Sequence, residues 1–158
     1  TRIFGNWSIS DNTTFSSGMP LTALISGNLS NNINGSAPFN SLRAQATGQP
    51  VLPGGFNRTT LDYFNSAAFT VPPAGVYGNA ARNTIPGPPT IDFNTSLDRL
   101  IWISREKKTN LDFRIAANNI FNTVNFSGLA TTVNSSTFGR VTGAGSMRSL
   151  LFSVRFRF

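Results

Sequence analysis

The stretch MRSLLFSVRFRF, residues 147–158, decides the fold of this chain. From Leu150 onward its even positions are all apolar. Its odd positions are serine or arginine from Ser153 onward, whereas the apolar Leu151 interrupts the pattern. Because successive side chains of a strand point to opposite faces, the stretch predicts a strand with one apolar and one cationic face. A soluble sandwich would bury the apolar face, whereas a transmembrane barrel would turn it to lipid and turn the arginines to a wet lumen. The position of the strand at the extreme C-terminus favours the barrel.

Three more segments alternate between apolar and polar residues, and no segment of useful length shows the period of an amphipathic helix. We therefore expect strands near residues 4–17, 91–103, 110–121 and 147–158. The connections are one short charged turn and two long loops rich in Pro, Gly and Asn, at residues 104–110, 18–90 and 123–146. The predicted fold class is all-β, with about four antiparallel strands in a single β unit over residues 1–158. Such a unit would be part of an outer-membrane-type barrel or of a stacked β assembly.

The alternation sorts the side chains of these strands onto two faces. The apolar face is predicted to hold Trp7, Ile9, Phe15, Ile91, Phe93, Leu97, Leu111, Phe113, Ile115, Phe152, Val154 and Phe156. The opposite, lumen-facing side is predicted to hold the charges of Asp92, Asp98, Asp112, Arg114, Arg155 and Arg157. These charges could line a substrate path, but we favour cross-strand ion pairs, because opposite charges on facing strands are the common device of sheets.

The composition excludes several classes of function. The chain has no cysteine and no histidine, which removes thiol chemistry, disulfides, the usual zinc sites and histidine-based catalysis. We therefore expect neither an enzyme nor a cofactor. Thirteen basic against six acidic residues give a net charge of +7, but the arginines are scattered singly, which argues against nucleic-acid binding. No stretch has the apolar length of a transmembrane helix, so a membrane role would have to use strands.

Short motifs follow one another along the chain in a characteristic order. The upstream motifs are WSIS at residues 7–10, SGMPLT at 17–22, YFNSAAF at 63–69 and GNAARN at 78–83. The downstream motifs are LDFR at residues 111–114, NIFNTVNF at 119–126, STFGRVT at 136–142 and the final arginine-containing strand. Over nearly the whole chain this order resembles the C-terminal end of TonB-dependent receptor-like outer-membrane proteins. The subgroup with an N-terminal carboxypeptidase-regulatory-like domain is the most similar.

The resemblance implies the last strands of a large barrel that takes up a bulky ligand in a bacterial outer membrane. It also implies that Phe158 belongs to the C-terminal signal read by the barrel-assembly machinery. If the C-terminus is periplasmic, the turn at residues 104–110 is periplasmic too, and both long loops lie outside. The plug domain, the TonB-contacting segment and most barrel strands are missing from the sequence, which begins at Thr1 rather than at Met. We therefore expect a processed or truncated product.

About four strands cannot close a barrel, because even small barrels need roughly eight. The open edges and the apolar face would therefore seek a partner: outer-membrane lipid, the remainder of the parent barrel, or copies of the chain itself. Two functions follow, a TonB-dependent receptor barrel and a self-assembling, filament-forming protein at the cell surface or outside the cell. A soluble carbohydrate-binding sandwich that uses Trp7, Trp102 and Tyr63 ranks last. The two tryptophans fit interfacial aromatic girdles and a protein–protein interface equally well.

Overall fold

The chain divides into two compact units. The computed structural model describes residues 5–26, 42–104, 106 and 108–158. The first unit, here called the sheet unit, comprises Thr1–Ser16, Thr90–Asn125 and Gly145–Phe158. The second, here called the loop unit, comprises Ser17–Pro89 and Phe126–Ala144. The sequence predicted a single β unit over residues 1–158, whereas the structure places the two long loops in a compact unit of their own.

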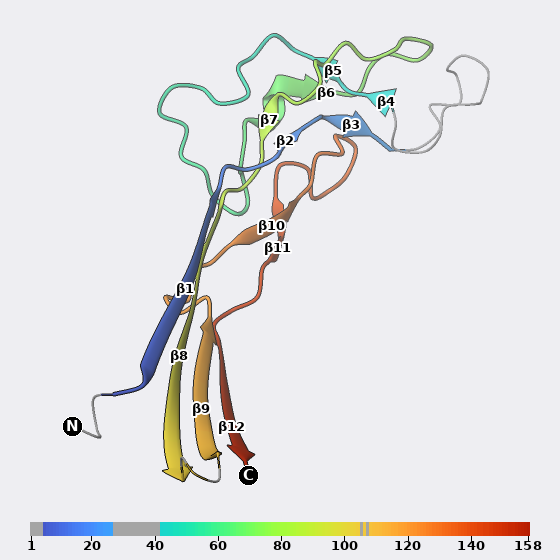
Figure 1. Cartoon of the computed structure of the whole chain (residues 1–158). Coiled ribbons are helices and arrows are strands. Elements are labelled where there is room, and N and C mark those ends of the chain that lie inside the picture. Colours follow the sequence, from blue (N-terminus) through green and yellow to red (C-terminus); the bar gives the residue numbers. More distant parts are fainter. Residues whose placement is uncertain (1–4, 27–41, 105, 107) are drawn as a thin grey trace. The chain divides into compact units, whose positions relative to one another are not determined.

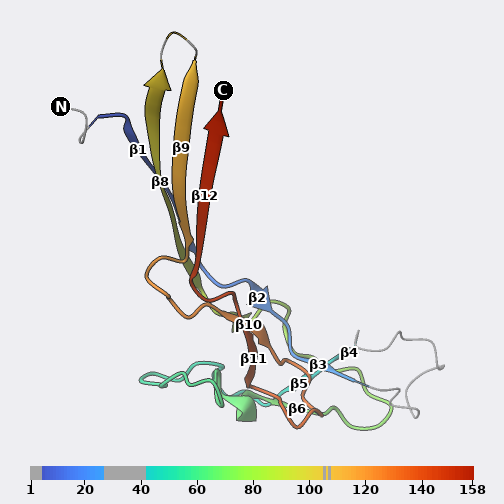
Figure 2. The ribbon, with the colours of Figure 1, turned by 90° about the horizontal axis from the view of Figure 1, so that it is seen from below.

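The sheet unit is one antiparallel sheet of four strands in the order β1-β8-β9-β12 (Figure 1). Its strands are β1 (Trp7–Ser16), β8 (Thr90–Ser104), β9 (Thr109–Asn118) and β12 (Ser149–Arg157). Each strand pairs with the next long strand along the chain, so the sheet is a simple up-and-down meander, and Figure 2 shows the four strands side by side. The predicted all-β, antiparallel fold class is confirmed.

The strand ends are set by local backbone geometry. Asn6, with a φ of 63°, lies directly before β1, and Lys108, with a φ of 56°, lies directly before β9. A left-handed backbone at a residue other than glycine is uncommon outside turns, so the chain bends at both positions, and at Lys108 it reverses between β8 and β9. The first strand was expected from residue 4, which lies outside the described residues.

Strand β9 ends at Asn118, whereas the sequence predicted a strand up to residue 121. Asn119 has a φ of 49° and turns the chain out of the sheet. Its side-chain nitrogen donates to the carbonyls of Thr123 at 2.8 Å and Ser146 at 3.3 Å, and its side-chain oxygen accepts from the Thr123 amide at 2.8 Å. The buried Asn119 side chain thus organises a turn inside the NIFNTVNF motif.

In its described residues, the loop unit is built from very short strand pairs and one short helical turn. The pairs are β2 (Pro20–Leu21) with β7 (Ile85–Pro86), β3 (Leu24–Ile25) with β4 (Leu42–Arg43), β5 (Gln45–Ala46) with β6 (Phe69–Thr70), and β10 (Phe126–Leu129) with β11 (Val141–Ala144). The helical turn is the 3-10 helix η2 (Ser66–Ala68), and the Asn65 side chain accepts a hydrogen bond from the Ala67 amide at its start.

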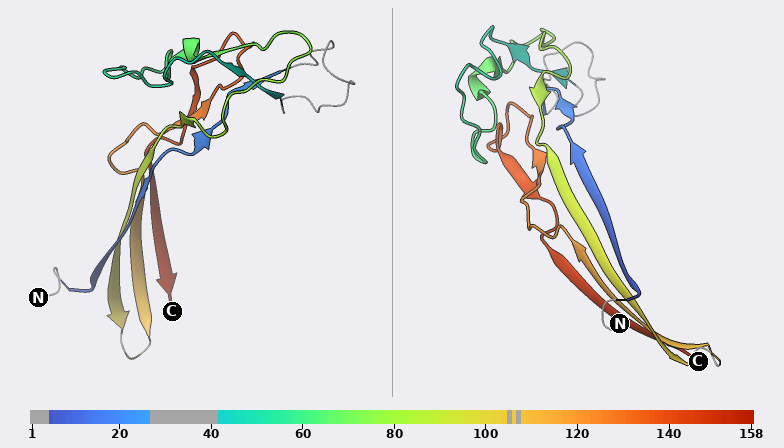
Figure 3. Two further views of the ribbon diagram at one scale, coloured as in Figure 1. Left: turned by 90° about the horizontal axis from the view of Figure 1, so that it is seen from above. Right: turned by 60° about the vertical axis from the view of Figure 1, so that its left-hand side comes forward.

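The loop unit contains a hydrophobic core that joins the two long loops. Phe64 is fully buried, and its ring meets Phe69 and Phe138 edge-on at centroid distances of 6.3 and 5.2 Å. The Leu24 amide donates to Thr131 at 2.9 Å, so backbone hydrogen bonds also cross between the loops. Figure 3 shows the green and orange segments of this unit lying together. The long connections therefore fold as one body rather than as independent irregular loops.

Candidate functional site

The register of the sheet places most apolar and most charged side chains on opposite faces, although the charged residues Asp11 and Arg99 fall on the apolar side. Leu97 faces Ile9 on one side and Ile115 on the other, while Asp98 faces Ser8 and Arg114. Continued along all four strands, the register places on one face Trp7, Ile9, Phe15, Ile91, Phe93, Leu97, Leu111, Phe113, Ile115, Phe152, Val154 and Phe156. It places on the other Asp92, Asp98, Asp112, Arg114, Arg155 and Arg157. We call these the apolar face and the charged face.

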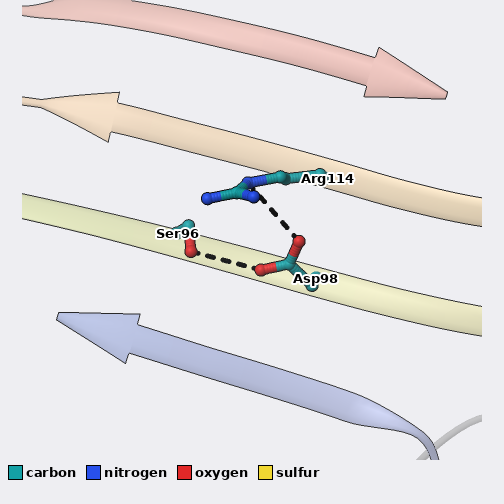
Figure 4. Close-up of polar contacts among 3 residues, drawn as sticks. All are labelled: Ser96, Asp98 and Arg114. Atoms are coloured by element: carbon teal, nitrogen blue, oxygen red, sulfur yellow. Dashed lines mark hydrogen bonds and ion pairs between the residues drawn. The ribbon is translucent and has the colours of Figure 1, made fainter.

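An ion pair crosses the charged face between β8 and β9. The Arg114 Nε atom lies 3.5 Å from Asp98 Oδ1, and the Ser96 hydroxyl donates to Asp98 Oδ2 at 3.2 Å (Figure 4). The side chains of Arg114 and Asp98 are 56% and 29% exposed. An ion pair with this exposure contributes about 0.2–1 kcal/mol, so its main effect is to fix the register of the two strands.

The other predicted charges continue this pattern across the charged face. Asp112 stands directly opposite Arg155 in the register of β9 and β12. The Asp92 carboxylate accepts a hydrogen bond of 2.6 Å from the Asn125 side chain, which also pairs with the backbone of Ile91. Opposite charges thus face each other across neighbouring strands, Asp98 with Arg114 and Asp112 with Arg155, and the sheet presents a polar, wettable wall.

Aromatic rings gather near both ends of the apolar face. Phe93 meets Phe15 at 5.6 Å and Phe121 at 4.9 Å, both edge-on, where β1 ends and β8 begins. At the other ends of the strands, the Arg99 guanidinium lies 4.9 Å from the Trp7 ring centroid, and Phe156 stacks on Phe158 at 5.9 Å. Sequence reasoning missed Phe121, which lies beyond the end of β9.

The middle of the apolar face is open and contains one acidic residue. Ile9 and Phe152 are 74% and 67% exposed, so the sheet unit itself does not bury this face. Asp11 lies among these residues and accepts hydrogen bonds of 2.6 Å from the hydroxyls of Thr13 and Thr95. Two hydroxyl donors thus satisfy the carboxylate that interrupts the apolar alternation of β1.

The two tryptophans lie on opposite faces of the sheet. Trp7 belongs to the apolar face, whereas Trp102 pairs with Asn110 on the charged face. A register shift between Trp102 and Ser104 disturbs the alternation at that end of β8. The two rings therefore do not form one girdle or one sugar platform.

A cleft in the loop unit is a second candidate site, and the sequence did not point to it. It has a volume of about 460 Å³ and is lined by Thr22, Leu24, Leu42, Arg43, Tyr77, Gly78 and Arg82. No group of three metal-ligating side chains occurs among the residues that the structure describes. The described helical segment is too short to cross a membrane.

Comparison with known protein families gives one match. A family described as an outer membrane beta barrel domain matches residues 1–151. No match was found among curated proteins or among solved structures.

Proposed function

This chain belongs to the outer membrane β-barrel domain family, and we propose that its sheet unit is a section of the wall of a TonB-dependent receptor-like transport barrel. The observation that carries this proposal is the separation of the apolar face from the charged face over four consecutive antiparallel strands. In an outer-membrane barrel, lipid meets an apolar outer band, while the interior is polar. The chain is thus an outer-membrane barrel protein, and its role is transport rather than catalysis.

The lengths of the strands support a membrane span. Strands β1 and β9 have 10 residues each and β12 has 9, whereas β8 has 15. A tilted transmembrane strand needs about 9–11 residues, so three strands match the span and β8 extends beyond it. The aromatic rings near both ends of the apolar face agree with the two aromatic girdles of such barrels.

In this function, each face of the sheet unit has a different partner. The apolar face contacts outer-membrane lipid, and the charged face lines the lumen through which the ligand passes. Phe158 is 97% exposed and therefore accessible to a protein such as the barrel-assembly machinery. The ligand of such a receptor is bulky, and a cofactor or a nucleic-acid partner has no part in this function.

A second candidate function comes from the edges of the sheet. In the described part of the chain, β1 pairs only with β8, and β12 pairs only with β9, so one edge of each outer strand is open. Barrel closure needs roughly eight strands, which other segments of a longer protein or other copies of the chain must supply. If β12 of one copy instead pairs with β1 of the next and the series does not close into a ring, the chain is a self-assembling, filament-forming protein at the cell surface.

Single-cysteine labelling in lipid vesicles tests the assignment of the two faces, since the natural chain has no cysteine. Ser153→Cys and Val154→Cys place a thiol on the charged and the apolar face of the same strand. We expect a membrane-impermeant maleimide to label Ser153→Cys and to leave Val154→Cys unlabelled until detergent is added. Equal labelling of both variants in lipid would contradict the barrel wall.

Negative-stain electron microscopy separates the two candidate functions. A transport barrel is expected to give discrete particles only in detergent or lipid. Regular filaments in detergent-free buffer would instead support self-assembly and would remove transport as the role of this chain.

A further inference from the structure

The cleft of the loop unit is cationic because almost no acidic residue balances its arginines. Residues 17–89 and 126–144 contain the basic side chains of Arg43, Arg58, Arg82 and Arg140, and Asp62 is the sole acidic residue in both ranges. Arg43 and Arg82 both line the cleft, whereas Asp62 does not. A concave surface lined by charges of one sign focuses the electrostatic field and concentrates ions of the opposite sign.

Hydrogen bonds and close packing hold the walls of the cleft. One Arg43 guanidinium nitrogen donates to the Ala80 carbonyl at 3.0 Å, and a guanidinium group carries five N–H donors in all. The Thr22 hydroxyl accepts from the Asn83 amide at 2.9 Å. Gly78 is buried directly beneath the backbone of Arg43 and Ala44, where any Cβ atom would overlap their carbonyl oxygens. Arg43 and Thr22 are therefore held in place before any ligand binds.

The rest of the lining is apolar or aromatic. Leu24 and Leu42 contribute aliphatic surface, and Tyr77, a residue that is 60% exposed, contributes an aromatic ring. A volume of about 460 Å³ lies within the range of small-molecule sites, which combine mostly apolar walls with a few placed polar groups.

We propose that this cleft binds a small organic anion. Arg43 and Arg82 hold its carboxylate or phosphate group, and its apolar body packs against Leu24, Leu42 and Tyr77. A guanidinium matches the planar, bidentate geometry of such oxyanions better than a lysine does, and all four basic residues of the loop unit are arginines. This site goes beyond the barrel wall and depends neither on transport nor on self-assembly.

Three probes separate the anionic part of recognition from the apolar part. These are 2-naphthoate, its neutral isostere 2-naphthamide and acetate, each titrated by NMR against the full chain in detergent micelles. We expect saturable binding of 2-naphthoate and about tenfold weaker binding of 2-naphthamide, because a hydrogen bond to a charged group is worth about 1.5–3 kcal/mol. We expect acetate to bind more weakly still. Equal affinities for 2-naphthoate and 2-naphthamide, or no binding of either, would overturn the proposal.

A matched pair of variants locates the site. Arg82→Gln removes one charge from the cleft, and Arg140→Gln removes the same charge from the same unit outside the cleft. We expect Arg82→Gln to weaken 2-naphthoate binding at least about fivefold, and Arg140→Gln to change it less than about twofold, since one charged hydrogen bond is lost only in the first. Arg43→Gln gives a second, independent measurement on the other arginine of the cleft. Equal losses in Arg82→Gln and Arg140→Gln would show general attraction by the basic loop unit and would refute the site.

Discussion

At the scale of single residues, Asn119 stabilises the turn that follows β9. It is 3% exposed, adopts a left-handed backbone, and satisfies backbone groups of Thr123 and Ser146. We expect Asn119→Ala to lower the free energy of unfolding by about 2–3 kcal/mol, because it leaves buried backbone groups unpaired and puts alanine at a positive φ. Urea denaturation in micelles measures this loss.

Two further substitutions separate the loss of the side-chain hydrogen bonds from the cost of the positive φ. Asn118→Ala removes only an exposed hydrogen bond of 3.2 Å to the Ser149 hydroxyl, and we expect it to cost less than about 0.5 kcal/mol. Asn119→Gly tolerates the positive φ but still lacks the side chain, so we expect a loss between those of the other two variants. Equal stability of Asn119→Ala and Asn118→Ala would contradict the role of Asn119 in the turn.

At the scale of elements, the short strands of the loop unit depend on close backbone contact. Gly78 lies against the carbonyls of Arg43 and Ala44, where β4 passes towards β5. We expect Gly78→Ala to lower the free energy of unfolding by about 1–3 kcal/mol, because the added methyl must push these backbone segments apart. Gly54→Ala is the control, since an added Cβ atom there would meet no other atom within 4 Å, and its stability should be nearly unchanged. Thermal unfolding of the two variants distinguishes them, and equal stability would contradict the contact.

Of these elements, the long strands of the sheet unit are the ones that sequence patterns can predict. The alternation of apolar and polar residues predicted all four long strands, β1, β8, β9 and β12. The two faces of this sheet differ in polarity, and the sequence of each strand therefore alternates with a period of two residues. The alternation also gave the grouping of the apolar and charged side chains, which follows from the same period. The end of β9 was predicted too late, although the alternation itself stops at Asn118. The apolar residues Ile120 and Phe121 that follow the Asn119 turn made the strand look longer than it is.

The loop unit could not be predicted in the same way. Its core combines scattered small and aromatic side chains, such as Ala44, Phe64 and Ile85, from segments without a period. Strands of two residues are too short to show any alternation, and their pairing depends on contacts far apart in the sequence, such as Leu24 with Thr131. The cleft arises from the same long-range contacts. Thr22 belongs to the SGMPLT motif and Arg82 to the GNAARN motif, but neither motif by itself indicates that a cleft forms.

At the scale of the whole molecule, an outer-membrane barrel requires that the two faces of the sheet meet different solvents. Leu151 and Phe152 are neighbours in β12, both are large and apolar, and they are 63% and 67% exposed. Leu151 faces Ala116 on the charged face, whereas Phe152 faces Ile115 on the apolar face. The pair therefore differs mainly in the face that each residue occupies, and arginine at each position tests what that face contacts.

We expect Phe152→Arg to destabilise the protein in lipid vesicles by about 2–4 kcal/mol, because an arginine on the lipid face carries its charge into hydrocarbon. We expect Leu151→Arg to cost less than about 1 kcal/mol, because its charge would stay in water on the charged face, directly opposite Ala116. Urea unfolding from vesicles, followed by tryptophan fluorescence, measures both losses. Equal losses would mean that both faces meet water or that both are packed against protein, and either result would be incompatible with a barrel wall in lipid.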